Sequence, residues 1–184
     1  MPGFPIALLT IIMVPAICLL ACPGLDAQTP PSGEPGTVRP ETARAVVLSL
    51  YFADSERFAL LAEQRQLPYP ENPVAFGKTI IRELTTGPRG KHLLRTLPDG
   101  DILRAFFIDT DKTAYVDLNA AMWARHPGGV QADMLAIYSI VNSLVLNMAE
   151  IDAVKIMSRG REPIPTDGHL DLHYPLKADI LLIR

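Results

Sequence analysis

The residues best suited to chemistry in this chain of 184 amino acids lie near its C-terminal end, in the stretch His169-Leu170-Asp171-Leu172-His173. In an extended strand, alternate residues point to the same face, so two imidazoles and one carboxylate would stand together. Imidazole nitrogens and carboxylate oxygens bind zinc, which makes this face a candidate metal site. The competing interpretation is the wet side of an edge strand. We favour it because apolar side chains fill the other face and no further ligands lie nearby in sequence.

A run of basic side chains after the dipeptide Gly87-Pro88 is the second candidate. Arg89, Lys91 and Arg95 predict a contact surface for an anionic glycan, lipid head groups or an acidic partner. Three further basic residues flank them, namely Arg82, His92 and Arg104. The alternative is a solvated loop whose charge is balanced by neighbouring acidic residues.

The motifs of the large enzyme classes are absent from the chain. It has no GxSxG elbow, HExxH helix, P-loop or glycine-rich dinucleotide fingerprint. Its formal net charge of -3 is spread along the chain, which argues against a nucleic-acid partner. We therefore expect a protein that is not an enzyme and needs no cofactor. The alternative from another class is a metal carrier or metal-dependent envelope hydrolase that uses the two histidines.

The N-terminal segment has the features of an export signal. Ile6 to Leu20 is an apolar run with the length of a signal-peptide core rather than of a membrane span. It ends in Leu19-Leu20-Ala21-Cys22, which resembles the lipobox of bacterial lipoproteins. The resemblance implies that residues 1–21 are removed and that Cys22 carries fatty-acyl chains such as palmitate. Such an anchor would hold the protein stably on a membrane of the cell envelope.

Two other forms of export stay open. Cleavage after Ala27 would release a soluble periplasmic protein, and an uncleaved segment would itself serve as the anchor. Residues 22–44 are rich in proline, glycine, serine and threonine and have few large apolar side chains. Such a composition cannot offset the entropy lost on ordering, so it predicts a disordered linker. The folded domain is expected at residues 45–184, without disulfides because both cysteines precede it.

Several elements must position the candidate residues. Ala45 to Phe52 alternates as a strand, and Asn72-Pro73 is a favourable helix start, with the helix ending before Gly87-Pro88. Ser55 to Leu67 is ambiguous between helix and strand. The remaining expected elements are two strands at 102–108 and 113–118 joined as a hairpin, a short helix at 119–125, a long helix at 130–148, a strand around 154–156 and a last alternating piece at 169–174.

The order of these elements and their local sequences resembles the GerMN domain found in sporulation and spore-germination proteins. The matching motifs are Leu84-Thr85-Thr86-Gly87-Pro88, Leu97-Pro98-Asp99-Gly100, Ala114-Tyr115-Val116-Asp117-Leu118-Asn119, Ile140-Val141-Asn142-Ser143-Leu144 and Gly168-His169-Leu170-Asp171-Leu172. The resemblance covers about Val46 to Tyr174. It implies an α+β fold, with a small and mainly antiparallel sheet packed by two main helices. It also implies that Leu60 to Leu67 is a strand paired with the first.

The resemblance also bears on function. Members of this family are commonly exported or lipid-anchored on a flexible linker, and no catalytic residues are carried over from them. The domain is similar to the ring-building folds of envelope-spanning machines, which implies assembly. We therefore expect a lipid-anchored envelope protein whose single domain binds a protein or peptidoglycan. A self-assembling scaffold, in which homo-oligomers form rings, is a further alternative.

Overall fold

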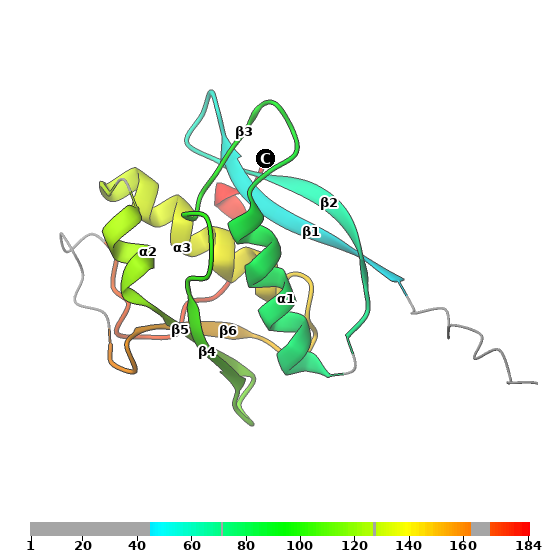
Figure 1. Ribbon diagram of the computed structural model, residues 1–184, viewed down its shortest axis with the longest axis vertical. Coiled ribbons are helices and arrows are strands. Elements are labelled where there is room, and N and C mark those ends of the chain that lie inside the picture. Colours follow the sequence, from blue (N-terminus) through cyan, green and yellow to red (C-terminus); the bar gives the residue numbers. More distant parts are fainter. Residues whose placement is uncertain (1–44, 71, 127, 163–169) are drawn as a thin grey trace, which may run out of the picture. The chain divides into compact units, whose positions relative to one another are not determined.

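The computed structural model describes residues 45–184, except 71, 127 and 163–169. The predictions for the signal peptide, for Cys22 and for the linker at 22–44 lie outside the described residues. The described part has the expected α+β architecture, in which α1 (Pro73–Thr86) and α3 (Val130–Val145) are the main helices (Figure 1). The strands form two three-stranded sheets rather than one.

The first sheet consists of β1 (Ala45–Asp54), β2 (Leu60–Pro68) and β3 (Leu93–Leu94), in the order β2-β1-β3. All pairs are antiparallel, and β2 aligns with β1 along its whole length. The strand that family resemblance implied after Leu60 is therefore confirmed, against its local helical propensity. One face of β1 is apolar and buried, with Leu50 and Phe52 fully enclosed.

Helix α1 begins and ends where its sequence predicts. Asn72 accepts a hydrogen bond from the backbone N–H of Ala75 at 2.8 Å, which satisfies one of the free donors of the first turn. Gly87 follows the last turn with φ of 85°, a conformation that side chains disfavour. The apolar face of α1, which includes Ile80 and Leu84, is buried.

The second sheet consists of β4 (Leu103–Ile108), β5 (Thr113–Leu118) and β6 (Ala153–Ser158), in the order β4-β5-β6. The first two strands form the predicted hairpin, whereas β5 and β6 are parallel. Helix α1 lies so close against β4 at Gly77 that a Cβ atom at this position would come within 2.2 Å of the Phe106 ring. A larger residue at this position would push the helix away from the sheet.

Parallel pairing of β5 and β6 requires a long crossover, which α2 (Ala120–Arg125) and α3 supply. Both helices were predicted, although α3 ends at Val145 rather than at Met148. Most of its buried residues are apolar and join the common core with Ile137 and Val141. The same helix also buries several polar side chains.

These polar side chains complete the free edge of β1, which β3 covers only at its last two residues. Ser139 Oγ donates to the carbonyl of Tyr51 at 2.6 Å, and Ser143 Oγ accepts from the Tyr51 N–H at 3.1 Å. In the turn that follows α3, the half-buried Asn147 amide exchanges two hydrogen bonds with the backbone of Ser49, at 2.9 and 2.8 Å. Helix α3 thus takes the place of a neighbouring strand and satisfies backbone groups that burial would otherwise leave unpaired.

The predicted alternating strand near the C-terminus is wrong over residues 170–174, which form bends. Leu172 is buried in the core. Lys155, in β6, donates to the carbonyl of Leu172 at 3.2 Å and to that of His173. Because these two carbonyl oxygens accept from the buried Lys155 ammonium group, they are not available to the hydrogen-bond ladder of a regular strand.

Candidate functional site

Arg95, one of the three residues predicted to form a contact surface, is used inside the fold. Its guanidinium donates to the carbonyl of Thr85 and, at 3.0 Å, to the carbonyl of Thr86. These are carbonyls in the last turn of α1, which have no partner within the helix and which attract positive charge. Asp99 is 3.8 Å from the same guanidinium. Arg95 therefore caps the helix.

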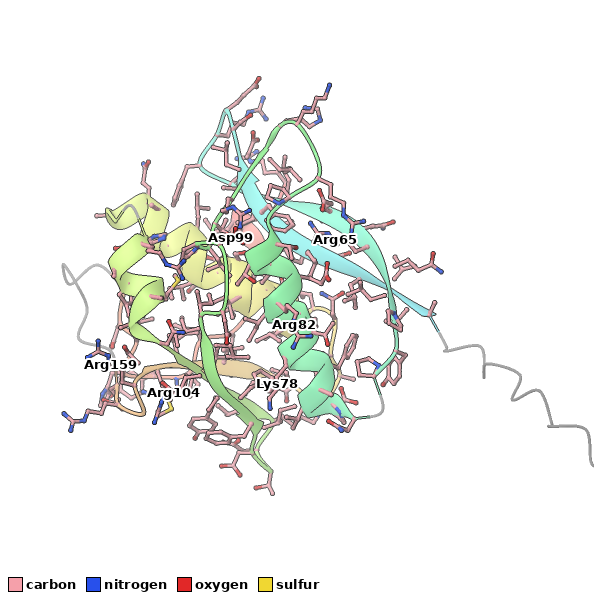
Figure 2. The ribbon with its side chains drawn as sticks, in the orientation of Figure 1. Arg65, Lys78, Arg82, Asp99, Arg104 and Arg159 are labelled. Atoms are coloured by element: carbon pink, nitrogen blue, oxygen red, sulfur yellow. The ribbon has the colours of Figure 1, made fainter. Side chains whose placement is uncertain are left out.

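Arg65, in β2, reinforces the same helix end, a role that its sequence context does not predict. Its side chain is 1% exposed and donates to the carbonyls of Glu83 at 3.0 Å and Gly87 at 2.5 Å. It also forms ion pairs with the carboxylates of Glu63 at 2.6 Å and Glu83 at 2.9 Å. Its guanidinium carbon is 5.3 Å from the centroid of the Phe52 ring. Figure 2 shows Arg65 beside the C-terminal part of α1.

Glu63 extends this arrangement to the loop after α1. Its second carboxylate oxygen accepts from the backbone N–H groups of Arg89 at 2.7 Å and Gly90 at 2.9 Å. Burial alone would raise the pKa of Glu63, but the hydrogen bonds from Arg65, Gly90 and Arg89 outweigh it and hold the pKa below its ordinary value. We call Glu63, Arg65 and Arg95 the clamp. Arg89 and Lys91, the other two predicted contact residues, remain exposed.

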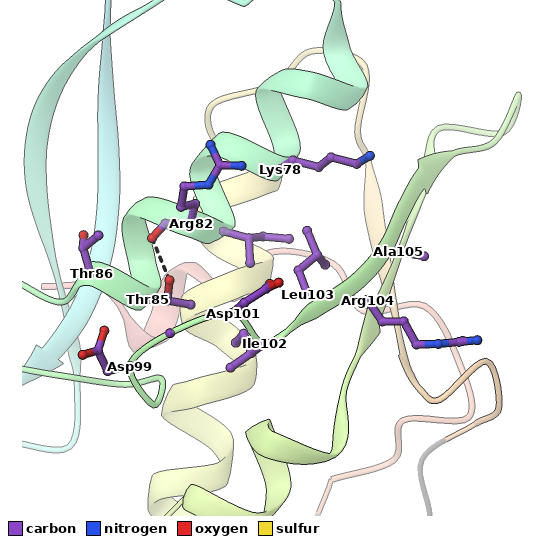
Figure 3. Close-up of a pocket in the computed structure, with 12 residues that line it drawn as sticks. Lys78, Arg82, Thr85, Thr86, Asp99, Asp101, Ile102, Leu103, Arg104 and Ala105 are labelled. Atoms are coloured by element: carbon purple, nitrogen blue, oxygen red, sulfur yellow. Dashed lines mark hydrogen bonds between the residues drawn. The ribbon is translucent and has the colours of Figure 1, made fainter.

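A pocket of about 530 Å³ lies between α1 and the segment that leads into β4 (Figure 3). Lys78 and Arg82 lie along one side of it, four residues apart and so on one face of the helix. Asp101 lines the facing segment, and buried Ile81 and Ile102 supply apolar walls. Among the described residues, no ion pair or hydrogen bond engages the side chains of Lys78, Arg82 and Asp101, and the hydrogen bond drawn in Figure 3 joins the Thr85 hydroxyl to the backbone carbonyl of Arg82. We call these three residues the pocket charges.

Arg104 also lines the pocket but already has a partner. It lies at an irregularity in the pairing of β4 with β5 and forms an ion pair with Asp117 at 2.5 Å. The Asp117 carboxylate is 5% exposed and also accepts from the backbone N–H of Gly160 at 2.9 Å. In Figure 3 the Arg104 side chain extends away from Arg82. Arg104 therefore stabilises the turn after β6, whereas the side chains of the pocket charges have no partner among the described residues.

The candidate metal face is not assembled as a strand would assemble it. His169 lies outside the described residues, and Asp171 accepts from the backbone N–H of His173 at 2.9 Å. The His173 imidazole pairs instead with Glu162 at 2.7 Å. Hydrogen bonds from Lys155 and then His173 lower the pKa of the Glu162 carboxyl. Within 45–184, leaving out 71, 127 and 163–169, no three potential ligands converge on a metal position.

The helices of the described segments are too short or too polar to cross a membrane. The chain matches no curated protein. Among solved structures, it is similar to the tandem GerMN domains of the sporulation protein GerM from Bacillus subtilis. The identity is 19% and the TM-score 0.55, over 67% of this chain but only 43% of that one. The chain thus spans less than half of the tandem protein.

Two further structures resemble the chain. One is the first GerMN domain of the same Bacillus subtilis protein, with 20% identity and a TM-score of 0.50, over 64% of this chain and 86% of that one. The other is a protein from Clostridium perfringens, provisionally named a lipoprotein, with 21% identity and a TM-score of 0.50, over 72% and 87%. At these identities the likeness shows a common fold.

The family itself is shown by sequence. The Germane family, described as sporulation and spore germination, matches residues 49–163, which include α1, the pocket and the crossover. This region contains all the motifs that resembled the GerMN domain except the last, at 168–172. The chain belongs to the Germane family of sporulation and spore germination proteins.

Proposed function

We propose that this protein is a non-catalytic binding module of the bacterial cell envelope, tethered by lipid at Cys22, which recruits an envelope protein or peptidoglycan through the pocket beside α1. The observation that carries the proposal is the contrast in charge use around that helix. The clamp arginines already form hydrogen bonds with backbone carbonyls and ion pairs with carboxylates. Lys78, Arg82 and Asp101 line an open pocket and have no such partners among the described residues.

Unpaired charges in a concave surface favour binding for a physical reason. An exposed charge is well solvated, so a partner must supply opposite charge in a fixed geometry to displace its water. A pocket fixes that geometry because its walls are rigid elements, here α1 and the segment entering β4. A pocket of this volume lies within the range that holds small ligands or short peptide segments.

The N-terminal region supports the location. A lipobox at Cys22 would place the protein on an envelope membrane, and the proline-rich residues 22–44 would hold the domain away from the membrane surface. Replacement of Cys22 by alanine is expected to abolish labelling with a fatty-acid analogue. Labelling that persists in Cys22→Ala would contradict the lipid anchor but would leave the binding module intact.

The binding function is tested by cross-linking the full chain in envelope fractions and identifying what it retains. We expect a specific protein or wall material with the wild-type chain and much less with the double variant Lys78→Gln/Arg82→Gln. The matched control is Arg57→Gln/Lys177→Gln, which also removes one arginine and one lysine charge, but at exposed positions outside the pocket. Capture that is equal in all three chains, or absent from all, would overturn the proposal.

A further inference from the structure

The pocket charges are of both signs, and the two signs come from different elements. Lys78 and Arg82 belong to α1, whereas Asp101 lies in the turn that precedes β4. Figure 3 shows Arg82 on the helix and Asp101 on the segment that leads into β4, without a hydrogen bond between their side chains. A ligand that fits such a site carries both anionic and cationic groups.

The walls between these charges restrict the ligand further. Ile81 and Ile102 are buried and line the pocket, and Leu103 and Ala105 add small and medium apolar surface. Such walls accept methyl groups but offer no large flat aromatic surface on which a sugar ring or a nucleobase would stack. The pocket volume of about 530 Å³ suits a few residues of extended peptide.

We propose that the pocket binds the stem peptide of peptidoglycan, through its free carboxylates at Lys78 and Arg82 and its side-chain amino group at Asp101. This proposal rests on the binding function argued above and names the ligand. Stem peptides combine alanine methyl groups, several carboxylates and, before cross-linking, one free amine. Each of these groups has a counterpart in the pocket, and the amine distinguishes an uncross-linked peptide from a cross-linked one.

The test is calorimetric titration of the full chain, in detergent, with the soluble peptide N-acetyl-L-alanyl-γ-D-glutamyl-meso-diaminopimelyl-D-alanine, whose acetyl group replaces the amide link to the glycan and leaves only the side-chain amine free. Two modified peptides accompany it, one acetylated at the free side-chain amine and one amidated at its carboxylates. We expect binding of the unmodified peptide that weakens as salt is raised, since screening reduces contacts between exposed charges. Each modification should weaken binding about two- to fivefold, as expected for the loss of a solvent-accessible ion pair.

Variants of the protein assign each contact. Asp101→Asn should weaken binding of the unmodified peptide as much as acetylation does, and acetylation should then have no further effect on that variant. The double variant Lys78→Gln/Arg82→Gln should behave in the same way toward the amidated peptide. This loss of additivity is the signature of a direct contact. Glu150→Gln and Arg57→Gln, at exposed positions outside the pocket, are the matched controls and should bind as the wild-type chain does.

The outcomes separate this inference from the function on which it rests. Absence of peptide binding, or additive effects of acetylation and Asp101→Asn, would overturn the stem-peptide assignment. If the wild-type chain then still captures an envelope protein that Lys78→Gln/Arg82→Gln loses, the binding function stands with a protein as partner. If neither the peptide nor any envelope component is bound, both proposals fail.

Discussion

Two groups of basic side chains meet the same helix and are used in opposite ways. At the C-terminal end of α1, Arg65 and Arg95 donate to carbonyls that the helix leaves unpaired. Along its side, Lys78 and Arg82 line a pocket and have no partner among the described residues. In sequence all four are ordinary basic residues. The comparison shows that a basic cluster becomes a candidate binding surface only where its charges are not already used to terminate secondary structure.

Loss of Arg65 should have the largest effect on stability. Arg65→Met would leave Glu63 Oε1, the Glu83 carboxylate and the carbonyl of Gly87 without the donors that Arg65 supplies. Removal of one partner from a buried ion pair typically costs about 3–5 kcal/mol, so we expect a loss of that order in the free energy of unfolding. Urea denaturation measures it, with Arg57→Met as the exposed control. A loss equal to that of the control would mean that the clamp does not hold the helix.

Glu63→Gln tests the acidic member of the clamp through the pH dependence of the free energy of unfolding. The pKa of Glu63 is lower in the folded protein than its ordinary value of 4.5. The ionised carboxylate therefore stabilises the fold above about pH 4.5, and this stabilisation is lost as pH falls through the lowered folded-state pKa. We expect the variant to be about 1–3 kcal/mol less stable at neutral pH, because it weakens charged hydrogen bonds.

The same variant should show less loss of stability on acidification than the wild-type protein. Urea denaturation at a series of pH values between neutral and strongly acid measures the difference. Curves for the two proteins that remain parallel below pH 4.5 would contradict the assigned role of the Glu63 carboxylate.

Arg95→Gln should have a moderate effect, because its side chain is 40% exposed and water can replace part of what it donates. We expect the free energy of unfolding to fall by about 1 kcal/mol, the usual size of a lost helix-terminal hydrogen bond. Hydrogen exchange should locate the change in the last turn of α1 and in the loop at 87–95. Exchange that quickens equally along the whole helix would indicate another cause.

Variants of the pocket charges should have the smallest effect on stability. Lys78→Gln/Arg82→Gln removes exposed side chains that make no ion pair among the described residues, so the free energy of unfolding should change by no more than about 0.5 kcal/mol. Thermal unfolding followed by circular dichroism measures it. A large loss would place these residues with the clamp and remove the distinction on which the proposed function depends.

Most elements could be predicted because their signals are local. Asn72 and Gly87 mark the ends of α1 through cap geometry, and the alternation after Ala45 marks β1. The division into two sheets and the parallel pairing of β5 with β6 depend on contacts between distant segments, which local patterns do not encode. The strand β2 was identified only through family resemblance, because its residues favour a helix locally.

The candidate site was predicted only in part. The sequence marks a basic region around Gly87, but it could not separate a capping arginine from a free one, since Arg95 reaches its carbonyls only in the folded chain. Arg65 was missed because an arginine in an alternating strand ordinarily points to solvent, whereas here the helix end requires it. The face with Asp171 and His173 was misread, because the carbonyls of 172 and 173 serve Lys155 instead of a ladder.

The most direct test of the account compares Lys78→Gln/Arg82→Gln with Arg95→Gln in the same capture experiment on envelope fractions. The account predicts that the pocket variant loses the retained protein or wall material while it stays as stable as the wild-type chain. It predicts that Arg95→Gln, although less stable, still retains the partner under conditions in which it is folded. Loss of capture by Arg95→Gln, together with full capture by the pocket variant, would contradict the proposal that the partner binds in the pocket beside α1.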